Sequence, residues 1–198
     1  EEHDDLALLI AKLGQGPLDR LLGVVCDFGI DGGRFRCREI TLLTGDHVAE
    51  MSDAAGTSWL DTGARDWSDD LLSATGLSRA NMPRLVEGSA VSGTLRDALA
   101  LRWGLPKGVV IAGGGGDNAA SGVGVGVVRA GDAFVSLGTS GVLFAANDGY
   151  QPDPATAVHT FCHALPDTWH QMGVILAAAA SLEWLAGILG APAPELTG

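Results

Sequence analysis

The sequence predicts an α/β fold, and three segments of the 198-residue chain carry that prediction. Residues 108–128 combine a short apolar strand, a turn of four glycines and a run of small side chains that suits a closely packed helix. Residues 133–145 place two apolar strands around a second glycine turn, which indicates a β-hairpin. Residues 174–189 are apolar and rich in alanine, and they favour a further helix.

The first fifth of the chain carries three weaker patterns. Residues 4–14 have Leu and Ile at helical spacing after an acidic first turn, which predicts a helix that ends at Gly14. The short apolar run at 21–30 predicts a strand. Residues 29–38 mix glycines with three arginines, and we expect a loop there.

Residues 40–104 predict short helices joined by loops. A helix is expected over 66–76, with acidic residues at its positively polarised N-terminus and a glycine at its end. Residues 78–82 predict a helical turn, and the spacing of apolar residues over 95–104 predicts another helix. The segments 44–46 and 92–93 indicate a turn and a loop, respectively.

Three histidines lie close together near the end of the chain. Residues 158–164 and 169–172 predict two strands, and alternation would place His159 and His163 on one face. With His170 they suggest a metal cluster, but no Cys, His and carboxylate spacing of a known zinc type accompanies them. We therefore expect core or hydrogen-bonded histidines.

Composition excludes several classes of function. With 12 Lys and Arg against 24 Asp and Glu the net charge is −12, which argues against a binder of nucleic acid or of anionic membranes. A hydrophobic content of 46% with 18% charged residues is far from that of a disordered chain. The three cysteines form no CxxC pair, so neither a disulfide framework nor a zinc site is indicated, and we expect a reducing, cytoplasmic location.

Asp117 is the first candidate for chemistry. It follows a predicted strand and the four glycines 113–116, and it precedes the small-residue helix. A carboxylate there can accept a proton from a substrate hydroxyl or help to hold a metal ion. The alternative is that Asp117 only caps the helix. A cap does not need four glycines, so their number favours a ligand near the backbone.

The second candidate is the turn Gly138-Thr139-Ser140-Gly141, whose backbone N–H groups and hydroxyls suit a phosphate. An ordinary hairpin turn is the alternative. Neither glycine turn has the GxxxxGK[ST] pattern of a P-loop. A dinucleotide site at 113–116 is disfavoured as well, because Asp132 precedes its strand, where that motif needs an acidic residue after a second strand.

Several separate motifs occur in the order in which one family has them. They are Leu43-Thr44-Gly45-Asp46-His47, Met51-Ser52-Asp53-Ala54-Ala55-Gly56-Thr57 with Trp59-Leu60-Asp61, and then 112–120, 132–143, 159–164 and 169–172. Over roughly residues 40–190 the chain resembles the FGGY carbohydrate kinases and, among them, those that act on xylulose. The resemblance implies a ribonuclease-H-like ATPase fold of the actin and hexokinase type. Residues 1–128 would hold the last part of the first domain, with 1–39 poorly matched, and 129–198 the first part of the second.

The resemblance also implies roles for the two candidates. Asp117 would be the catalytic base and would lie near Mg²⁺, Asp117 and Asn118 would contact the sugar, and Gly138, Thr139, Ser140 and Gly141 would bind the phosphates of ATP. The implied reaction transfers the γ-phosphoryl group of ATP to the 5-hydroxyl of D-xylulose. The family's first phosphate loop and its adenosine motif are not found in the sequence, so we expect a chain that is cut at both ends and inactive alone.

The sequence is also compatible with functions other than catalysis. The same cleft could belong to a sugar- or nucleotide-binding module, or to an actin-like scaffold piece, that transfers no phosphate. The expected partners are the small sugar and ATP, without nucleic acid or membrane, and a homodimer is compatible with the resemblance.

Overall fold

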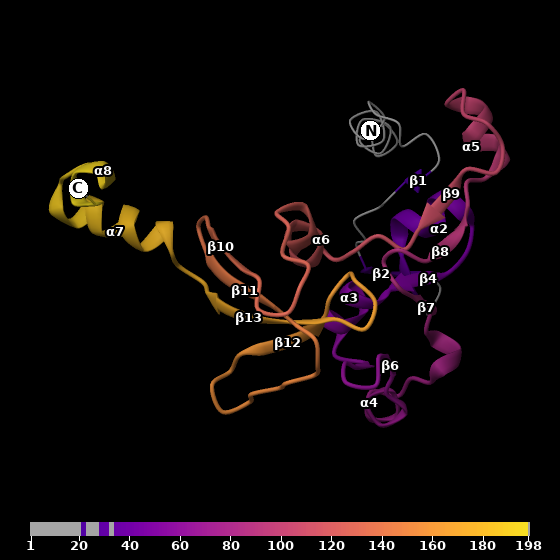
Figure 1. The fold of residues 1–198 in the computed structure, drawn as a ribbon, viewed down its shortest axis with the longest axis horizontal. Helices are drawn as coiled ribbons and strands as arrows, with labels where there is room; N and C mark the ends of the chain where they lie inside the picture. The colour runs from indigo at the N-terminus through magenta and orange to yellow at the C-terminus, as the bar shows by residue number, and fades with distance from the viewer. Residues whose placement is uncertain (1–20, 23–27, 32–33, 198) are drawn as a thin grey trace.

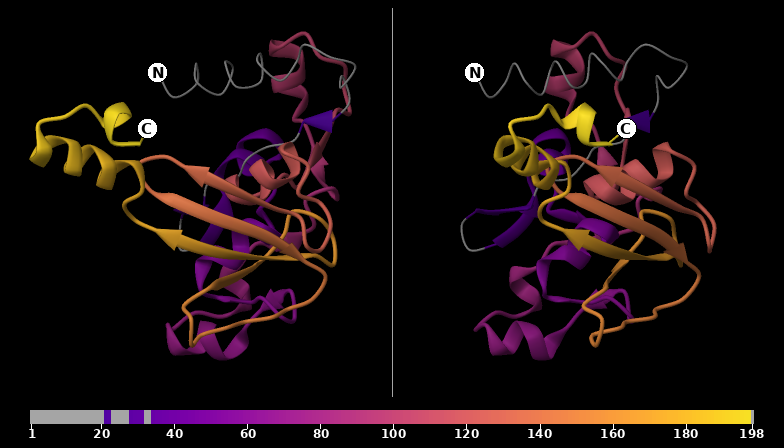
Figure 2. Two further views of the ribbon diagram at one scale, coloured as in Figure 1. Left: turned by 60° about the vertical axis from the view of Figure 1, so that its left-hand side comes forward. Right: turned by 90° about the vertical axis from the view of Figure 1, so that its left-hand side faces the viewer.

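The structure is a computed structural model that describes residues 21–22, 28–31 and 34–197. The helix expected at 4–14 lies outside the described residues. Figure 1 shows short helices and strands of the first part of the chain on one side and a four-stranded sheet, followed by the last two helices, on the other. The N-terminal end of helix α6 lies between these two parts, and the views of Figure 2 agree with this arrangement.

The first part is built from short elements. Its strands are β1 (Leu21–Leu22), β2 (Phe28–Asp31), β3 (Arg34–Cys37), β4 (Val48–Glu50), β5 (Leu60–Asp61), β6 (Asp66–Trp67), β7 (Arg84–Val86), β8 (Val91–Thr94) and β9 (Val110–Ala112). Its helices are α2 (Arg38–Thr44), α3 (Met51–Ala54), η1 (Ala55–Thr57), α4 (Asp69–Ala74), η2 (Arg79–Asn81), α5 (Asp97–Arg102) and α6 (Asp117–Gly124). Strand β9 lies between β1, which is parallel to it, and β8, which is antiparallel; β4 and β7 form a parallel pair.

Local patterns predict most of these elements correctly. The strand, glycine turn and helix expected at 108–128 are β9, the turn and α6, while η2 and α5 occupy the segments 78–82 and 95–104. The helix expected over 66–76 begins later, at Asp69, because Asp66 and Trp67 pair with β5. Ser68 is its N-cap, and the Ser68 hydroxyl oxygen accepts the Leu71 N–H at 3.3 Å.

Two expected loops are strands instead. Within the segment 29–38, the described residues of β2 and β3 pair as antiparallel strands rather than forming a loop, and Arg38 begins α2. The loop expected at 92–93 is part of β8. There the Ser92 hydroxyl donates to the carbonyl oxygens of Ile111 and Ala112, and a bulge accommodates the irregular register.

The second part of the chain is an antiparallel sheet followed by helices. It contains β10 (Ala133–Leu137), β11 (Gly141–Asn147), β12 (His159–Cys162), β13 (Trp169–Ile175), α7 (Ala179–Leu189) and α8 (Ala193–Thr197). The strand order is β10-β11-β13-β12, which confirms the expected hairpin and the two expected strands near the histidines. The helix expected from residue 174 begins at Ala179, because Val174 and Ile175 still pair with β11.

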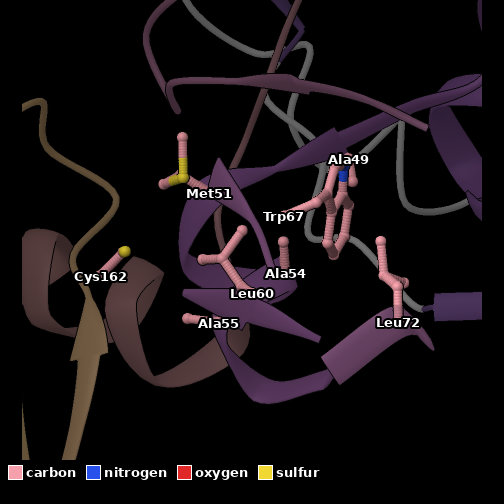
Figure 3. Packing of buried hydrophobic residues seen from close by; sticks show 8 residues of the cluster. All are labelled: Ala49, Met51, Ala54, Ala55, Leu60, Trp67, Leu72 and Cys162. Carbon is pink, nitrogen blue, oxygen red and sulfur yellow. The ribbon is translucent and has the colours of Figure 1, made fainter. Parts of the chain in front are cut away.

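One buried cluster joins the two parts of the chain. Trp67 and Leu72 are two of its members from the first part of the chain. Cys162, at the end of β12 in the second part, is fully buried in the same cluster. Figure 3 shows the Cys162 side chain beside the cluster that surrounds Leu60. Strand β12 is thus the edge of the sheet that packs on the first part. The domain boundary expected at residues 128 and 129 stays a prediction.

No helix within the described ranges is long and apolar enough to cross a membrane.

Candidate functional site

A pocket of about 150 Å³ lies where the N-terminus of α6 meets α3 and the strands β12 and β13. Ten residues line it: Ser52, Asp53, Gly56, Gly116, Asp117, Asn118, Ala119, Phe161, His170 and Met172. Both parts of the chain therefore contribute to its wall. The site predicted around Asp117 and Asn118 does border a hollow.

Asp117 is the first residue of α6 and is exposed at this pocket. Its Oδ1 accepts the backbone N–H of Asn118 at 2.6 Å, and the Asn118 Nδ2 donates to the same oxygen at 3.2 Å. The N-cap is Gly116, which has no side chain to offer. The carboxylate sits at the positive end of the helix dipole, which stabilises its negative charge while the side chain borders the pocket.

Packing within the protein explains three of the four glycines before Asp117. A Cβ on Gly113 would overlap the carbonyl oxygen of Glu87, and one on Gly115 would lie 3.0 Å from the Ala164 Cβ. Gly114 has a φ of +88°, which an L side chain rarely adopts. A Cβ on Gly116 would find ordinary contacts at 3.5 Å. The expectation that a ligand explains the glycines is therefore corrected for 113–115.

Glu50 and Ser52 hold this turn from the other side of the pocket. The Ser52 hydroxyl oxygen accepts the backbone N–H of Gly116 at 2.9 Å. The same hydroxyl donates to Glu50 Oε2 at 2.5 Å, and that oxygen also accepts the N–H groups of Ser52 and Asp53. Burial raises the pKa of the Glu50 carboxyl above its usual value; these hydrogen bonds oppose the rise, and the negative charge of Glu87 adds to it.

Of the three histidines near the end of the chain, two are core groups. His170 is buried on β13 and stacks on Phe144 with ring centroids 4.2 Å apart, and His163 is fully buried 5.8 Å from it. Burial and the neighbouring His163 lower the pKa of His170 to about 3, and burial lowers the pKa of His163 too. The expectation of core histidines is confirmed for His163 and His170, whereas His159 is exposed and is not a core residue. Among the residues that the structure describes, no three metal-binding side chains gather.

The second candidate lies apart from this pocket. Gly138, Thr139 and Ser140 are exposed between β10 and β11, and none of them lines the hollow at Asp117. The carbonyl oxygens of Thr139 and Gly138 accept the N–H groups of Ala178 and Ala179 at 2.8 and 3.0 Å. The backbone N–H groups at the start of α7 therefore hold the loop through the loop's own carbonyl oxygens. The structure brings Asp117 and Asn118 together and leaves Gly138–Gly141 at a separate place.

Local sequence patterns assign neither Glu50 nor Ser52 to a site, and they suggest His170 only as part of a disfavoured metal cluster, not as a residue of this pocket. A faint signal exists for Glu50, because it is a charged residue within the apolar run Val48-Ala49-Glu50-Met51. Ser52 contacts a residue 64 positions away, and no local pattern indicates such a pairing.

Residues 40–124 match the FGGY family of carbohydrate kinases, N-terminal domain. Over 148 residues the chain is 53% identical to a xylulose kinase of Klebsiella pneumoniae and 54% identical to a xylulose kinase of Escherichia coli K12. These alignments cover 75% of this chain and 30% of each relative. The chain thus spans about a third of the length of the curated relatives it matches.

Solved structures show the same likeness in three dimensions. The chain superposes with a TM-score of 0.76 on a structure described as a xyloylose kinase from Brucella ovis, at 63% identity over 79% of this chain and 32% of that one. A glycerol kinase of Plasmodium falciparum with ADP superposes with a TM-score of 0.64 at 16% identity, over 75% of this chain and 30% of that one. The predicted fold class, part of an actin- and hexokinase-type ATPase fold, is confirmed.

Proposed function

This chain belongs to the FGGY family of carbohydrate kinases, and from that premise we propose that the protein transfers the γ-phosphoryl group of ATP to the 5-hydroxyl of D-xylulose. Identity above 50% to two proteins named xylulose kinase supports D-xylulose as the sugar substrate. The observation that carries the proposal is the pocket at the N-terminus of α6, where Asp117 offers an exposed carboxylate and Asn118 an amide.

Asp117 would act as the general base. As the hydroxyl oxygen of the sugar attacks the γ-phosphorus, the O–H bond breaks and its proton passes to the carboxylate. A new bond joins the sugar oxygen to phosphorus, and the bond between phosphorus and the bridging oxygen of ADP breaks in line with it. Asn118, which already orients Asp117 through Nδ2, would donate a hydrogen bond to the sugar.

The pocket offers carboxylate groups of the kind that Mg²⁺ takes as ligands. Two carboxylate residues, Asp53 and Asp117, line it. Mg²⁺ commonly takes one or two carboxylates together with phosphate oxygens and water, so Asp117 would hold the ion. When bound, the ion neutralises charge on the phosphates. Because the chain carries a net charge of −12, nucleotide binding would depend on this local arrangement.

The loop Gly138–Gly141 would bind the phosphates of ATP. Its support is the exposed glycine, threonine and serine combination and a backbone that the start of α7 holds in place. We place this loop at the beginning of a second domain, after residue 128, and Asp117 near the end of the first. The substrates would then meet between two domains, and the transfer would need both phosphate-binding elements in register.

Substitution of Asp117 by Asn tests the proposal in the complete gene product. A side-chain amide at this position cannot accept the proton, so we expect kcat with D-xylulose and Mg-ATP to fall by about 10²–10⁴-fold. Sugar binding, measured by calorimetry, should stay within a few-fold of the wild-type value. The matched control is Asp167→Asn, at an exposed turn outside the pocket where φ is +51° and asparagine fits.

Three outcomes would contradict this proposal. Near-wild-type turnover in Asp117→Asn would remove the base role. A wild-type protein that binds D-xylulose and ATP without turnover would be a binding module, and one that binds neither would be an actin-like scaffold. For this 198-residue chain measured alone we expect no turnover.

A further inference from the structure

Glu50 is a fully buried carboxylic acid in the wall behind the pocket. It ends β4, which pairs in parallel with β7, and its neighbours Ala49 and Met51 belong to the buried apolar cluster. Placing an ionisable group there is costly unless its hydrogen bonds compensate. Helix α3, which it caps, has only four residues, and short polar side chains are the usual caps. Capping alone therefore gives a weak reason for a glutamate at this position.

The hydrogen bonds of Glu50 are concentrated on one oxygen. Oε2 accepts the Ser52 N–H at 2.9 Å, the Asp53 N–H at 3.1 Å and the Ser52 hydroxyl at 2.5 Å. Oε1 is buried without a hydrogen-bond partner in the part of the chain that the structure describes. The carboxyl is thus directed at Ser52, and it fixes the rotation of the Ser52 hydroxyl.

The fixed hydroxyl connects α3 with the turn before Asp117. Because its hydrogen points to Glu50, its lone pairs are available to the Gly116 N–H, which donates to Ser52 Oγ at 2.9 Å. The carbonyl oxygen of Gly116 accepts the Ala120 N–H at 2.8 Å. Gly116 is therefore held at both of its backbone groups, and Asp117 is the next residue. The position of the Asp117 carboxylate follows from this anchoring.

We propose that Glu50 is a positioning residue for phosphoryl transfer: it orients Ser52, which holds Gly116 and so places the carboxylate of Asp117 in the pocket. The role rests on the proposed function only in its effect on turnover. The anchoring of Gly116 is a property of the fold, and it can be measured without any substrate.

The first test is hydrogen exchange of the 113–118 segment in the complete gene product. In wild type and in Glu50→Gln, whose amide oxygen can still accept from Ser52, we expect protection of the Gly116 amide. In Glu50→Ala and Ser52→Ala we expect exchange at least about tenfold faster, the factor that corresponds to the loss of one hydrogen bond. Equal protection in all four proteins would overturn the proposal, whether or not the protein is a kinase.

The second test is turnover. A displacement of about 1 Å can cost about 10²-fold in rate, so kcat should fall about 10- to 100-fold in Glu50→Ala, with KM for the sugar little changed. Glu50→Gln should restore most of kcat. The double variant Glu50→Ala/Ser52→Ala should lose no more than the worse single variant, because the two residues act in series. The proposal would be overturned if the fold-loss of kcat in the double variant equalled the product of the two single losses. It would also be overturned if Glu50→Gln failed to restore kcat.

Ser92→Ala is the matched control. Ser92 is as deeply buried as Glu50, and its hydroxyl holds Ile111 and Ala112 in β9 without touching Gly116. The Ser92→Ala variant should be less stable than the wild type, with kcat and the exchange rate of the Gly116 amide unchanged. If Glu50→Ala fails to fold, Ser52→Ala carries both tests. Should Asp117→Asn stay fully active while Gly116 loses protection as expected, the proposed function fails and the anchoring stands.

Discussion

The two edges of the four-stranded sheet differ in how the protein surrounds them. Strand β12 packs on the first part of the chain, and Cys162 is fully buried there. Strand β10, at the opposite edge, has no buried residue. The glycine turn before Asp117 lies against the packed edge, whereas the loop Gly138–Gly141 begins at the open one. Similar glycine-rich sequences therefore meet opposite constraints.

The two glycine turns show what this difference means. At Gly113 the Glu87 carbonyl oxygen excludes a side chain, at Gly114 the positive φ disfavours one, and at Gly115 the Ala164 Cβ would crowd one. At Gly138 the nearest atom to an added Cβ is the Ser140 carbonyl oxygen at 3.8 Å. Glycine at 113–115 is thus explained by packing or backbone conformation within the protein. A Cβ at position 138 would meet no such obstacle, and the phosphate-binding role of this loop stays a prediction.

The largest effect is expected for an alanine in the packed turn. In Gly113→Ala the Cβ would overlap the Glu87 carbonyl oxygen and lie 3.1 Å from Val86 Cγ2, so the backbone must move. We expect a loss of about 3 kcal/mol in the free energy of unfolding, measured with urea. Gly138→Ala is the matched change at the open edge and should stay within about 0.5 kcal/mol. Equal losses would show that the two turns are constrained alike.

A smaller effect is expected at Arg65, which pairs with Glu87 in the first part of the chain and contacts Thr168 and Trp169 in the second. The Arg65 guanidinium donates to both oxygens of Glu87 and to the Thr168 carbonyl oxygen, and it lies 5.1 Å from the ring centre of Trp169. Its side chain is only 10% exposed. Arg65→Ala leaves Glu87 and Thr168 without these donors, and we expect a loss of about 2 kcal/mol in thermal unfolding experiments.

Arg79 provides the comparison for that change. It pairs with Asp66 and Asp69, but its side chain is 48% exposed. Water screens such pairs, so Arg79→Ala should change stability much less than Arg65→Ala. The reverse order would mean that burial at the packed edge does not strengthen the Arg65 contacts.

The packed edge should also make stability sensitive to acid. Burial lowers the pKa of His170 to about 3, whereas an imidazole in the unfolded chain is protonated near pH 6.5. The unfolded state therefore binds more protons between these values. The contribution of His170 is fully present above about pH 6.5 and is lost as the pH falls toward 3, by about 1 kcal/mol for each pH unit.

The variant His170→Phe isolates this contribution. Its ring can keep the stacking on Phe144 without taking up a proton, so the free energy of unfolding should fall less steeply between pH 6.5 and 4 than in wild type. An unchanged slope in His170→Phe would show that this imidazole takes up its proton alike in both states.

Local patterns predict the strand, turn and helix around Asp117 because apolar runs and glycines determine them within a few residues. The same holds for the β10–β11 hairpin. They fail within 29–38 and at 92–93, where glycine and polar residues favour a loop locally. Hydrogen bonding to a partner strand holds these residues in strands instead. They also give no indication that Ser52 meets Gly116, since that hydrogen bond joins distant segments. Sequence thus predicts the candidate base, but not the residues that hold it.

Strand β10 pairs only with β11 in the part of the chain that the structure describes. Its other side presents a row of backbone N–H and C=O groups beside exposed Val135 and Leu137, which are 61% and 73% exposed. An added strand could extend the sheet there without disturbing any existing pair, and the apolar side chains would favour its arrival. Among the described residues this edge of the four-stranded sheet is therefore the one available to a further strand, and Val135→Lys should weaken any pairing of a second copy of this chain there.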